Sequence, residues 1–269
     1  MEATKKYELS NETIEFNGIT LHRIKALKDF SYVKAGDLGG WVEKEDNLSQ
    51  MGDAWIGGDA KVYRNAKVSG NAKVFGDAQV YDYAQVFCDA EVYENAQVFG
   101  NAEVYGYALV YDNAEIYHNA KVFGNAEVYD NAEVFGNTEI YDNAKVCGNA
   151  NVYDNAMVCG DAKVYNHAMV GDNARVFGNT EVCGNAEVFG NAKICGNAVV
   201  KNNEDYIVFK NFWSSGRYFT WTRSNNMWTV GCFYGTGEEL IEKAYKDSEK
   251  SGKEYERVVR YVDSILADE

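Results

Sequence analysis

A small residue recurs at every sixth position through more than half of this 269-residue chain, and this repeat constrains the fold more than any other feature. Between Ala54 and Ala198 it fills 25 hexads without an insertion, and only Thr138 and Thr180 depart from alanine. An aliphatic residue, usually valine, follows two positions after each small residue. A short unit repeated at a fixed period indicates a solenoid, in which each unit stacks on its neighbours.

The hexad at 125–130, Asn-Ala-Glu-Val-Tyr-Asp, shows what each position does. Alternate residues of a strand point to opposite sides, so alanine and valine face one side while glutamate and tyrosine face the other. The remaining pair, usually Gly-Asn or Asp-Asn, suits a sharp corner because these residues tolerate the left-handed backbone region. The pattern therefore predicts stacked parallel strands around a thin core of alanine and valine.

This order of aliphatic, variable, two turn residues, small and variable resembles the hexapeptide-repeat family of left-handed parallel β-helices. The resemblance covers residues 54–200. It implies that three hexads form one triangular coil, so that the array makes about eight coils. A flat coil of two hexads is the alternative, because the array also has a secondary period of two hexads. The predicted fold class is an all-β solenoid followed by a small C-terminal α+β domain.

An aromatic residue usually follows the valine, and it faces outward if alanine and valine fill the core. Tyrosine is mostly followed by aspartate and phenylalanine by glycine, so each face is expected to alternate Phe-Gly with Tyr-Asp. Corner carboxylates then lie two strand spacings apart, which relieves repulsion. Four cysteines take later phenylalanine places and are interpreted as small apolar substitutes. The candidate interaction surface on the solenoid comprises Tyr81, Tyr93, Tyr129, Tyr141, Asp130 and Asp142.

Both ends of a solenoid expose unpaired strand edges that must be covered. Residues 1–53 are predicted to cap the first coil, with a hairpin that turns at an Asn-Gly pair. Trp41 is expected to plug the end of the core. The solenoid is expected to span residues 54–202 and a second module residues 203–269.

The second module has the pattern of a small α+β unit. Three runs rich in aromatic and β-branched residues predict strands, the last two joined at Asn225-Asn226. Thr236 followed by Glu239 is a capping-box signature that opens a helix, and Gly252 is expected to close it. A final helix carries apolar residues at helical spacing. Both helices are expected to pack on one face of the sheet.

This module also contains the candidate small-ligand site. Arg217 and Arg223 flank Phe219 and Trp221 on one side of a strand, a basic and aromatic surface that suits a nucleotide through stacking and phosphate pairing. Thr236 opens a helix whose N–H groups suit an anion. In the alternative, which we favour, both aromatic rings face the helices while the arginines extend along the edges.

The net charge of −15 excludes a protein that wraps nucleic acid by neutralising phosphates. Residues 54–200 contain 19 Asp and Glu but 9 Lys and Arg, so most of the excess lies on the solenoid. Such a charge favours solubility or a basic partner. The first residues lack an apolar signal core, and no stretch is apolar enough to span a membrane. Six cysteines without a disulfide pattern agree with the cytoplasmic location that we expect.

Many left-handed β-helices are acyltransferases, which resemble this chain in their coils but use a catalytic histidine beside an acyl-carrier groove. This chain has three histidines, His22, His118 and His167, and no loop projecting from the array. His118 and His167 take corner positions nearly three coils apart, so they cannot form one site within a subunit. We therefore predict no enzymatic activity, no catalytic residue, no metal site and no cofactor.

The opening segment LHRIKALKDF, the NAKV-type array and the ending GCFYGTGEEL together resemble hexapeptide-repeat proteins carried by bacteriophages and prophages. This resemblance implies a phage context. We predict a non-catalytic binding protein that forms homo-oligomers and inhibits a host defence or nucleic-acid-handling protein, a basic partner, without binding nucleic acid or membrane itself. It would act through the acidic and aromatic solenoid and the C-terminal module. The alternatives are a phage structural or scaffold protein and, less favoured, an acyltransferase.

Overall fold

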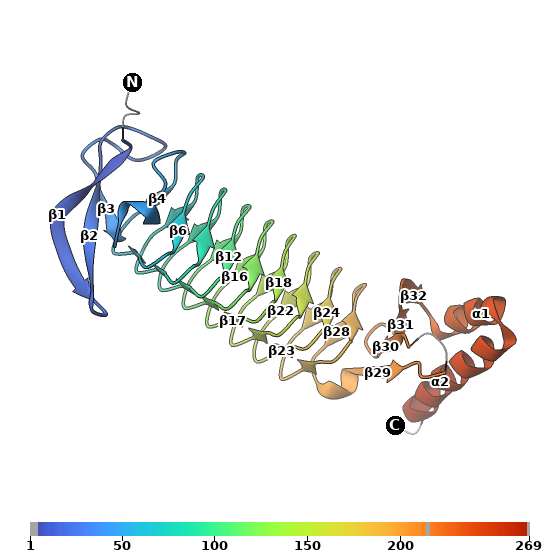
Figure 1. Cartoon of the computed structure of the whole chain (residues 1–269). Coiled ribbons are helices and arrows are strands. Elements are labelled where there is room, and N and C mark those ends of the chain that lie inside the picture. Colours follow the sequence, from blue (N-terminus) through green and yellow to red (C-terminus); the bar gives the residue numbers. More distant parts are fainter. Residues whose placement is uncertain (1–4, 214–215, 268–269) are drawn as a thin grey trace.

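The computed structural model describes residues 5–213 and 216–267. Figure 1 shows a long rod of stacked coils with a small cap at its N-terminal end and a compact module at its C-terminal end. Three parallel sheets form the sides of the rod, and each is built from two-residue strands. We call these sides the first, second and third face, in the order in which the chain reaches them.

The strands of each face follow one another along the rod. The first face contains β4 (Trp55–Ile56), β7 (Lys73–Val74), β10 (Glu91–Val92), β13 (Leu109–Val110), β16 (Glu127–Val128), β19 (Lys145–Val146), β22 (Lys163–Val164), β25 (Glu181–Val182) and β28 (Val199–Val200). The second face contains β5 (Lys61–Val62), β8 (Gln79–Val80), β11 (Gln97–Val98), β14 (Glu115–Ile116), β17 (Glu133–Val134), β20 (Asn151–Val152), β23 (Met169–Val170) and β26 (Glu187–Val188). The third face contains β6 (Lys67–Val68), β9 (Gln85–Val86), β12 (Glu103–Val104), β15 (Lys121–Val122), β18 (Glu139–Ile140), β21 (Met157–Val158), β24 (Arg175–Val176) and β27 (Lys193–Ile194).

Strands that pair on one face are separated by three hexads in the chain. Val62 of β5 opposes Val80 of β8, and Val98 of β11 opposes Ile116 of β14 in the same register. This register excludes the coil of two hexads and confirms the predicted triangular solenoid. The first face has nine hexad strands and each of the other two has eight, so eight coils are complete and a ninth begins.

Alanine and valine fill the interior, as the alternation predicts. Ala126 and Val128 have no exposed surface, and the same holds for nearly every residue at these two positions. One continuous apolar cluster runs from Tyr7 to Val200. Backbone groups pair between coils, as where the N–H of Glu127 donates to the carbonyl of Ala144 at 2.9 Å. Because alanine is so small, the three sheets approach closely and the core stays narrow.

The corners hold the left-handed backbone that the Gly and Asp positions predict. The φ angle is 60° at Asp130 and 80° at Gly136. The next position, usually asparagine, forms a ladder along each corner. Asn101 donates to Asn119 at 3.1 Å, and Asn119 donates to Asn137 at 3.0 Å. Asparagine therefore recurs because each amide both accepts from one coil and donates to the next.

The N-terminal cap is continuous with the second face. β1 (Tyr7–Phe16) and β2 (Ile19–Ala26) form the predicted hairpin, β3 (Leu38–Val42) connects β2 to β5, and the 3-10 helix η1 (Glu45–Asn47) follows. The prediction that Trp41 plugs the core is wrong. Its register opposite Lys61 turns the ring outward, where it packs beside Tyr63.

Tyr7 and Lys6 cover the end of the core instead. Tyr7 is fully buried, and its hydroxyl lies 2.7 Å from the carbonyl oxygen of Leu48. The Nζ of Lys6 donates to the carbonyls of Ala54 at 2.8 Å and Gly52 at 3.2 Å. Burial lowers the pKa of Lys6 to about 8. In later coils an alanine carbonyl accepts from the preceding coil, so this lysine satisfies an acceptor that has no preceding coil.

The C-terminal module follows η2 (Asn203–Asp205) and contains the strands β29 (Tyr206–Lys210), β30 (Tyr218–Thr222), β31 (Met227–Val230) and β32 (Phe233–Gly235) and the helices α1 (Gly237–Asp247) and α2 (Glu249–Ala267). The sequence prediction of three strands omits β32. Gly252 lies inside α2, so the prediction that it ends a helix is wrong. A Cβ at Gly252 would lie 2.2 Å from the ring of Tyr245, so glycine allows the two helices to approach.

The face of this sheet that is turned away from the helices covers the last coil. The hydroxyl of Thr220 accepts from the N–H of Lys193 at 3.0 Å, and the hydroxyl of Tyr206 donates to the carbonyl of Glu187 at 2.8 Å. Polar side chains thus take the place of a further coil. The division into 1–53, 54–202 and 203–269 stays a prediction. Among the described residues, no helix has the length and apolar character needed to cross a membrane.

The two threonines that replace core alanines differ in their hydrogen bonding. Thr138 donates to the carbonyl of Phe135 at 2.5 Å, whereas the buried hydroxyl of Thr180 has no partner among the described residues. We expect Thr180→Ala to raise the free energy of unfolding by about 1 kcal/mol, because it removes an unsatisfied polar group. Thr138→Ala is the control and should lower it by about 1 kcal/mol. Denaturant titration measures both changes, and an equal response would contradict this account.

Candidate functional site

The outward aromatic side chains form three columns, one on each face. On the first face Phe75, Tyr93, Tyr111 and Tyr129 stack with ring centroids 4.9 Å apart and planes within 5° of parallel. Similar columns run on the second face from Tyr63 to Tyr153 and on the third face from Phe87 to Tyr141. The rings cover one another's flat surfaces and present their edges to solvent. Much of each column is therefore structural packing.

The corner beside the first-face column carries three consecutive carboxylates. Glu94, Asp112 and Asp130 hold the same left-handed corner position in successive coils, one strand spacing apart. We call these three residues the acidic edge. The prediction that Phe-Gly and Tyr-Asp alternate on every face is wrong here, because Tyr111-Asp112 stands in a hexad where the alternation places Phe-Gly.

The acidic edge is ordered by hydrogen bonds and has no basic partner among the described residues. A carboxylate oxygen of Asp112 accepts from the N–H of Asp130 at 3.2 Å, and one of Asp130 accepts from the N–H of Gly148 at 2.9 Å. The hydrogen bond with Asp112 raises the pKa of Glu94, as expected where negative charge accumulates. None of the ion pairs found in the described part of the chain includes these three residues.

The solenoid residues singled out from the sequence lie on three different faces. Tyr93, Tyr129 and Asp130 belong to the first face, Tyr81 to the second, and Tyr141 and Asp142 to the third. The structure therefore brings only the first group together. Of the acidic edge, the sequence-based prediction included Asp130 alone, because the alignment of Glu94, Asp112 and Asp130 appears only when the array is folded into coils of three hexads.

The tyrosine and cysteine side chains of the columns are not activated for catalysis. Burial and nearby Glu127 raise the pKa of Tyr111 to about 12, so its hydroxyl stays protonated at neutral pH. Burial also raises the pKa of the Cys147 and Cys159 thiols. A thiol with a raised pKa is a poor nucleophile and metal ligand. These groups are suited to packing and hydrogen bonding.

The structure does not form the ligand surface considered for the C-terminal module. Phe219 and Trp221 are buried against α1 and α2, as the favoured alternative holds, so neither ring is open to a ligand. Arg217 is exposed, and the Nε of Arg223 donates to the carbonyl of Glu204 at 3.3 Å. The hydroxyl of Thr236 accepts from the N–H of Glu239, so the predicted capping box is present.

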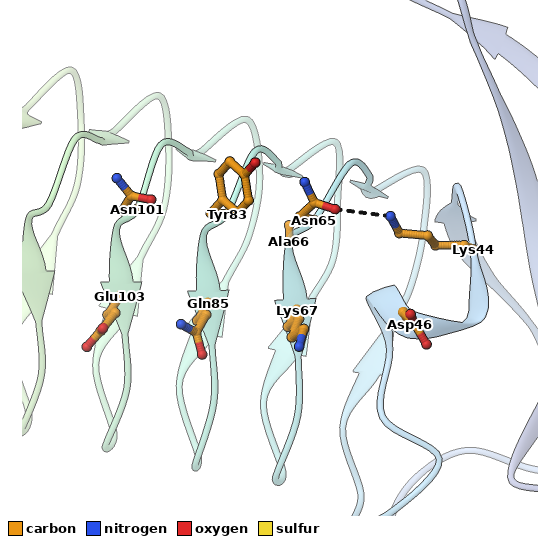
Figure 2. Close-up of a pocket in the computed structure, with 9 residues that line it drawn as sticks. All are labelled: Lys44, Asp46, Asn65, Ala66, Lys67, Tyr83, Gln85, Asn101 and Glu103. Carbon is orange, nitrogen blue, oxygen red and sulfur yellow. Dashed lines mark hydrogen bonds between the residues drawn. The ribbon is translucent and has the colours of Figure 1, made fainter.

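A polar groove of about 500 Å³ lies where the third face meets the cap. Figure 2 shows Lys67, Gln85 and Glu103 in a row on consecutive strands, with Tyr83 on the neighbouring corner and Lys44 at the end. Tyr83 is 62% exposed and interrupts a ladder that asparagine otherwise forms. Sequence reasoning missed this groove, although tyrosine in an asparagine place is a visible signal. Its lining suits hydrogen bonding to a polar ligand.

The three histidines do not share a site. His118 lies on the corner that follows β14 on the second face, and its ring centroid is 4.9 Å from that of Tyr117. His167 lies on the corner that follows β22 on the first face, where it interrupts the asparagine ladder, and His22 lies in β2. No group of three His, Cys, Asp or Glu residues that could hold a metal ion occurs within residues 5–213 and 216–267.

Comparison with known proteins gives a match over part of the chain. No protein-family model matches the chain. Part of it resembles a protein named as an acetyltransferase. The uncharacterized acetyltransferase YdcK of Escherichia coli (strain K12) is 38% identical over 60 residues, which cover 19% of this chain and 18% of that protein. The chain thus spans less than a fifth of the length of the curated relative that it matches.

The prediction that the chain is not an enzyme is contradicted by this match. That prediction rested on the absence of a projecting loop and of clustered histidines in this chain, whereas the match is to a protein named as an acetyltransferase. The resemblance to hexapeptide-repeat proteins is supported by both the coils and the match. The link to bacteriophages finds no support in the comparisons and stays a prediction, as do the host partner and the homo-oligomer.

Proposed function

We propose that this chain is a recognition protein that binds the basic surface of a partner protein through its acidic edge. The observation that carries the proposal is the stack of Glu94, Asp112 and Asp130 on successive coils with no lysine or arginine paired to them in the described structure. A row of like charges on a rigid support is costly to assemble, and a cationic partner relieves that cost.

The surroundings of the acidic edge also suit a protein partner. The edges of Tyr93, Tyr111 and Tyr129 run beside the carboxylates, so apolar and hydrogen-bonding surface adjoins the charge. Tyrosine is favoured at interfaces because its ring and hydroxyl supply contact area with little loss of side-chain entropy. The rod holds these groups at fixed spacing, which reduces the ordering cost of binding.

The test uses a defined cationic probe, a twelve-residue peptide in which lysine alternates with glycine. We expect the variant E94Q/D112N/D130N to bind this peptide about tenfold more weakly than the natural chain at low salt, with the difference fading at high salt. The matched control E8Q/E12Q/E15Q removes the same charge from exposed positions of β1 and should keep the natural affinity. Isothermal titration calorimetry at two salt concentrations measures both.

Equal weakening by the two triple variants would show that overall charge, and not the acidic edge, attracts the peptide. The finer hypothesis names a host protein that handles nucleic acid as the partner. It predicts that duplex DNA and this chain compete for the same partner. Equilibrium sedimentation of the isolated chain tests the predicted homo-oligomer independently of any partner.

Acetyl transfer is the second candidate, and the match to the protein named as an acetyltransferase favours it. His118 is the candidate base, because it is exposed on a corner between Gly100 and Gly136, which leave space on both sides of the imidazole. Turnover of acetyl-coenzyme A with a panel of amine and hydroxyl acceptors should then fall at least tenfold in His118→Asn and stay unchanged in His167→Asn. Turnover that survives both substitutions would reject this assignment.

A further inference from the structure

The aromatic column of the first face stops one coil before the end of the rod. Tyr129, Tyr111, Tyr93 and Phe75 stack in order at 4.9 Å, and the next position in the column, directly after β4, is Gly57. Phe75 therefore stacks on Tyr93 with one side of its ring, while its other side faces Gly57, where the column has no aromatic residue. A Cβ built at Gly57 would make ordinary van der Waals contacts, 3.7 Å from Cδ1 of Trp55 and 3.8 Å from Cβ of Phe75, so the backbone at Gly57 accommodates a side chain.

The same replacement elsewhere in the array does not leave a gap. Gly171 takes the aromatic place on the second face, and there Tyr153 and Phe189 lean toward each other until their centroids are 6.1 Å apart. A Cβ at Gly171 would lie 2.7 Å from the ring of Tyr153. The gap at Gly57 is thus not a general result of losing one ring, because at Gly171 the neighbours close it.

A pocket of about 480 Å³ lies beside Gly57, between the first face and the loop of residues 27–37 that joins β2 to β3 in the cap. Two further aromatic side chains, Tyr32 of the loop and Trp55 of β4, line it beside Phe75. The indole Nε1 of Trp55 lies 3.8 Å from the position of a Gly57 Cβ and forms no hydrogen bond within the described residues. The full lining comprises Tyr32, Val33, Asp37, Leu38, Trp55, Gly57, Gly58, Lys73, Phe75 and Glu91.

A second, polar compartment of about 390 Å³ adjoins this pocket and shares Lys73 and Glu91 with it. Lys73 is paired with Glu91 at 2.6 Å, so its charge is already balanced. The other residues that line the compartment are Ser31, Asp53, Asn71, Asp89 and Tyr107. Carboxylates accept hydrogen bonds from hydroxyl groups and repel phosphate, so this compartment suits an uncharged polyhydroxylated group.

We propose that the two compartments together bind a nucleoside. The base would occupy the missing place in the column and stack on Phe75, since every base offers a flat ring to an aromatic side chain. Trp55 Nε1 would donate to a ring nitrogen, and the Asp37 carboxylate would accept from an amino group of the base. The ribose would lie over the polar compartment, with its hydroxyls donating to Asp89 and Glu91. This site is separate from the acidic edge and does not depend on its function.

Adenosine is the first probe, with binding followed by calorimetry and by quenching of tryptophan fluorescence. The natural chain should bind adenosine with a Kd below about 1 mM and bind adenosine monophosphate at least tenfold more weakly, because the carboxylates repel the phosphate. Gly57→Phe restores the repeat by placing a ring under Phe75, so it should abolish binding while the chain keeps or gains thermal stability. Phe75→Leu should weaken binding at least tenfold.

Phe123→Leu is the control, since Phe123 takes the aromatic place of its hexad in the third-face column, between Tyr105 at 4.9 Å and Tyr141 at 5.0 Å, away from the pocket. It should leave the affinity for adenosine unchanged. Absence of binding for adenosine, guanosine, cytidine and uridine at about 10 mM would overturn the proposal. Unaltered adenosine binding in Gly57→Phe would overturn it too, and tighter binding of the monophosphate would reject the uncharged nucleoside as the ligand.

Discussion

Gly136→Val is expected to lower the free energy of unfolding by about 2 kcal/mol more than Gly136→Asn. Gly136 has φ of 80°, and a Cβ there would lie 2.6 Å from the carbonyl oxygen of Asp154 in the next coil. Both variants add a Cβ, so the next coil must shift slightly in each. They differ in that valine is β-branched and strongly disfavoured in the left-handed region, while asparagine tolerates it.

The chain itself shows which side chains these corners accept. Arg64, Cys88, Glu94 and His118 have φ between 58° and 60°, but no β-branched residue has a positive φ in the described chain. Chemical denaturation followed by circular dichroism measures the two changes. Gly190→Val serves as the control, because a Cβ at Gly190 meets nothing within 4 Å and reports the backbone strain alone. Equal costs for Gly136→Val and Gly136→Asn would contradict the left-handed corner as the constraint.

The solenoid could be predicted from the sequence because each hexad specifies its own structure. Within a single hexad, Ala126 and Val128 specify the inward side of a strand and Asp130 specifies the corner. This pattern occurs 25 times, which leaves little room for another interpretation. The number of hexads in a coil is a different matter. It depends on whether strands pair two or three hexads apart. The resemblance to the hexapeptide-repeat family implies three, whereas the alternation of Tyr-Asp and Phe-Gly hexads suggests two. Only the observed register, Val62 opposite Val80, decides it.

The caps were harder to predict because they contain no repeat. Trp41 is a large apolar residue that precedes the first coil, yet Tyr7 and the Lys6 amine close the core through contacts with residues far along the chain, Leu48 and Ala54. Glycine is a residue type that commonly ends helices, but Gly252 lies inside α2, where it packs against Tyr245 of α1. In both cases a tertiary contact, invisible in local sequence, overrides the local preference.

The candidate sites follow the same division. That tyrosines and corner carboxylates lie outside was predictable from the alternation within a hexad. Their grouping was not, because Tyr81, Tyr93 and Tyr141 are equivalent in sequence and lie on three faces. The departures from the repeat proved more informative than the repeat itself. Gly57 in an aromatic place and Tyr83 in an asparagine place are each visible in the sequence, and each lines a pocket.

Ala84→Leu is expected to lower the free energy of unfolding by about 3 kcal/mol, while Gln85→Leu should change it by about 0.5 kcal/mol or less. The two residues are adjacent, Ala84 fully buried in the core and Gln85 exposed on β9. Leucine adds three carbons to a core whose width is set by alanine on every coil, so the sheets must separate or the side chain must adopt a strained rotamer. At position 85 the same side chain meets solvent, as the natural Leu109 does at the equivalent place on the first face.

Denaturant titration of both variants measures the difference, and hydrogen exchange locates it. Contacts in a solenoid join only neighbouring coils, so the loss of protection in Ala84→Leu should centre on the strands paired with β9, namely β6 and β12, and decline toward the ends of the rod. A chain that loses protection uniformly would instead unfold as one cooperative unit. Equal destabilisation by the two leucines would mean that Ala84 does not face the core, and the inward column of small residues on which the fold depends would have to be abandoned.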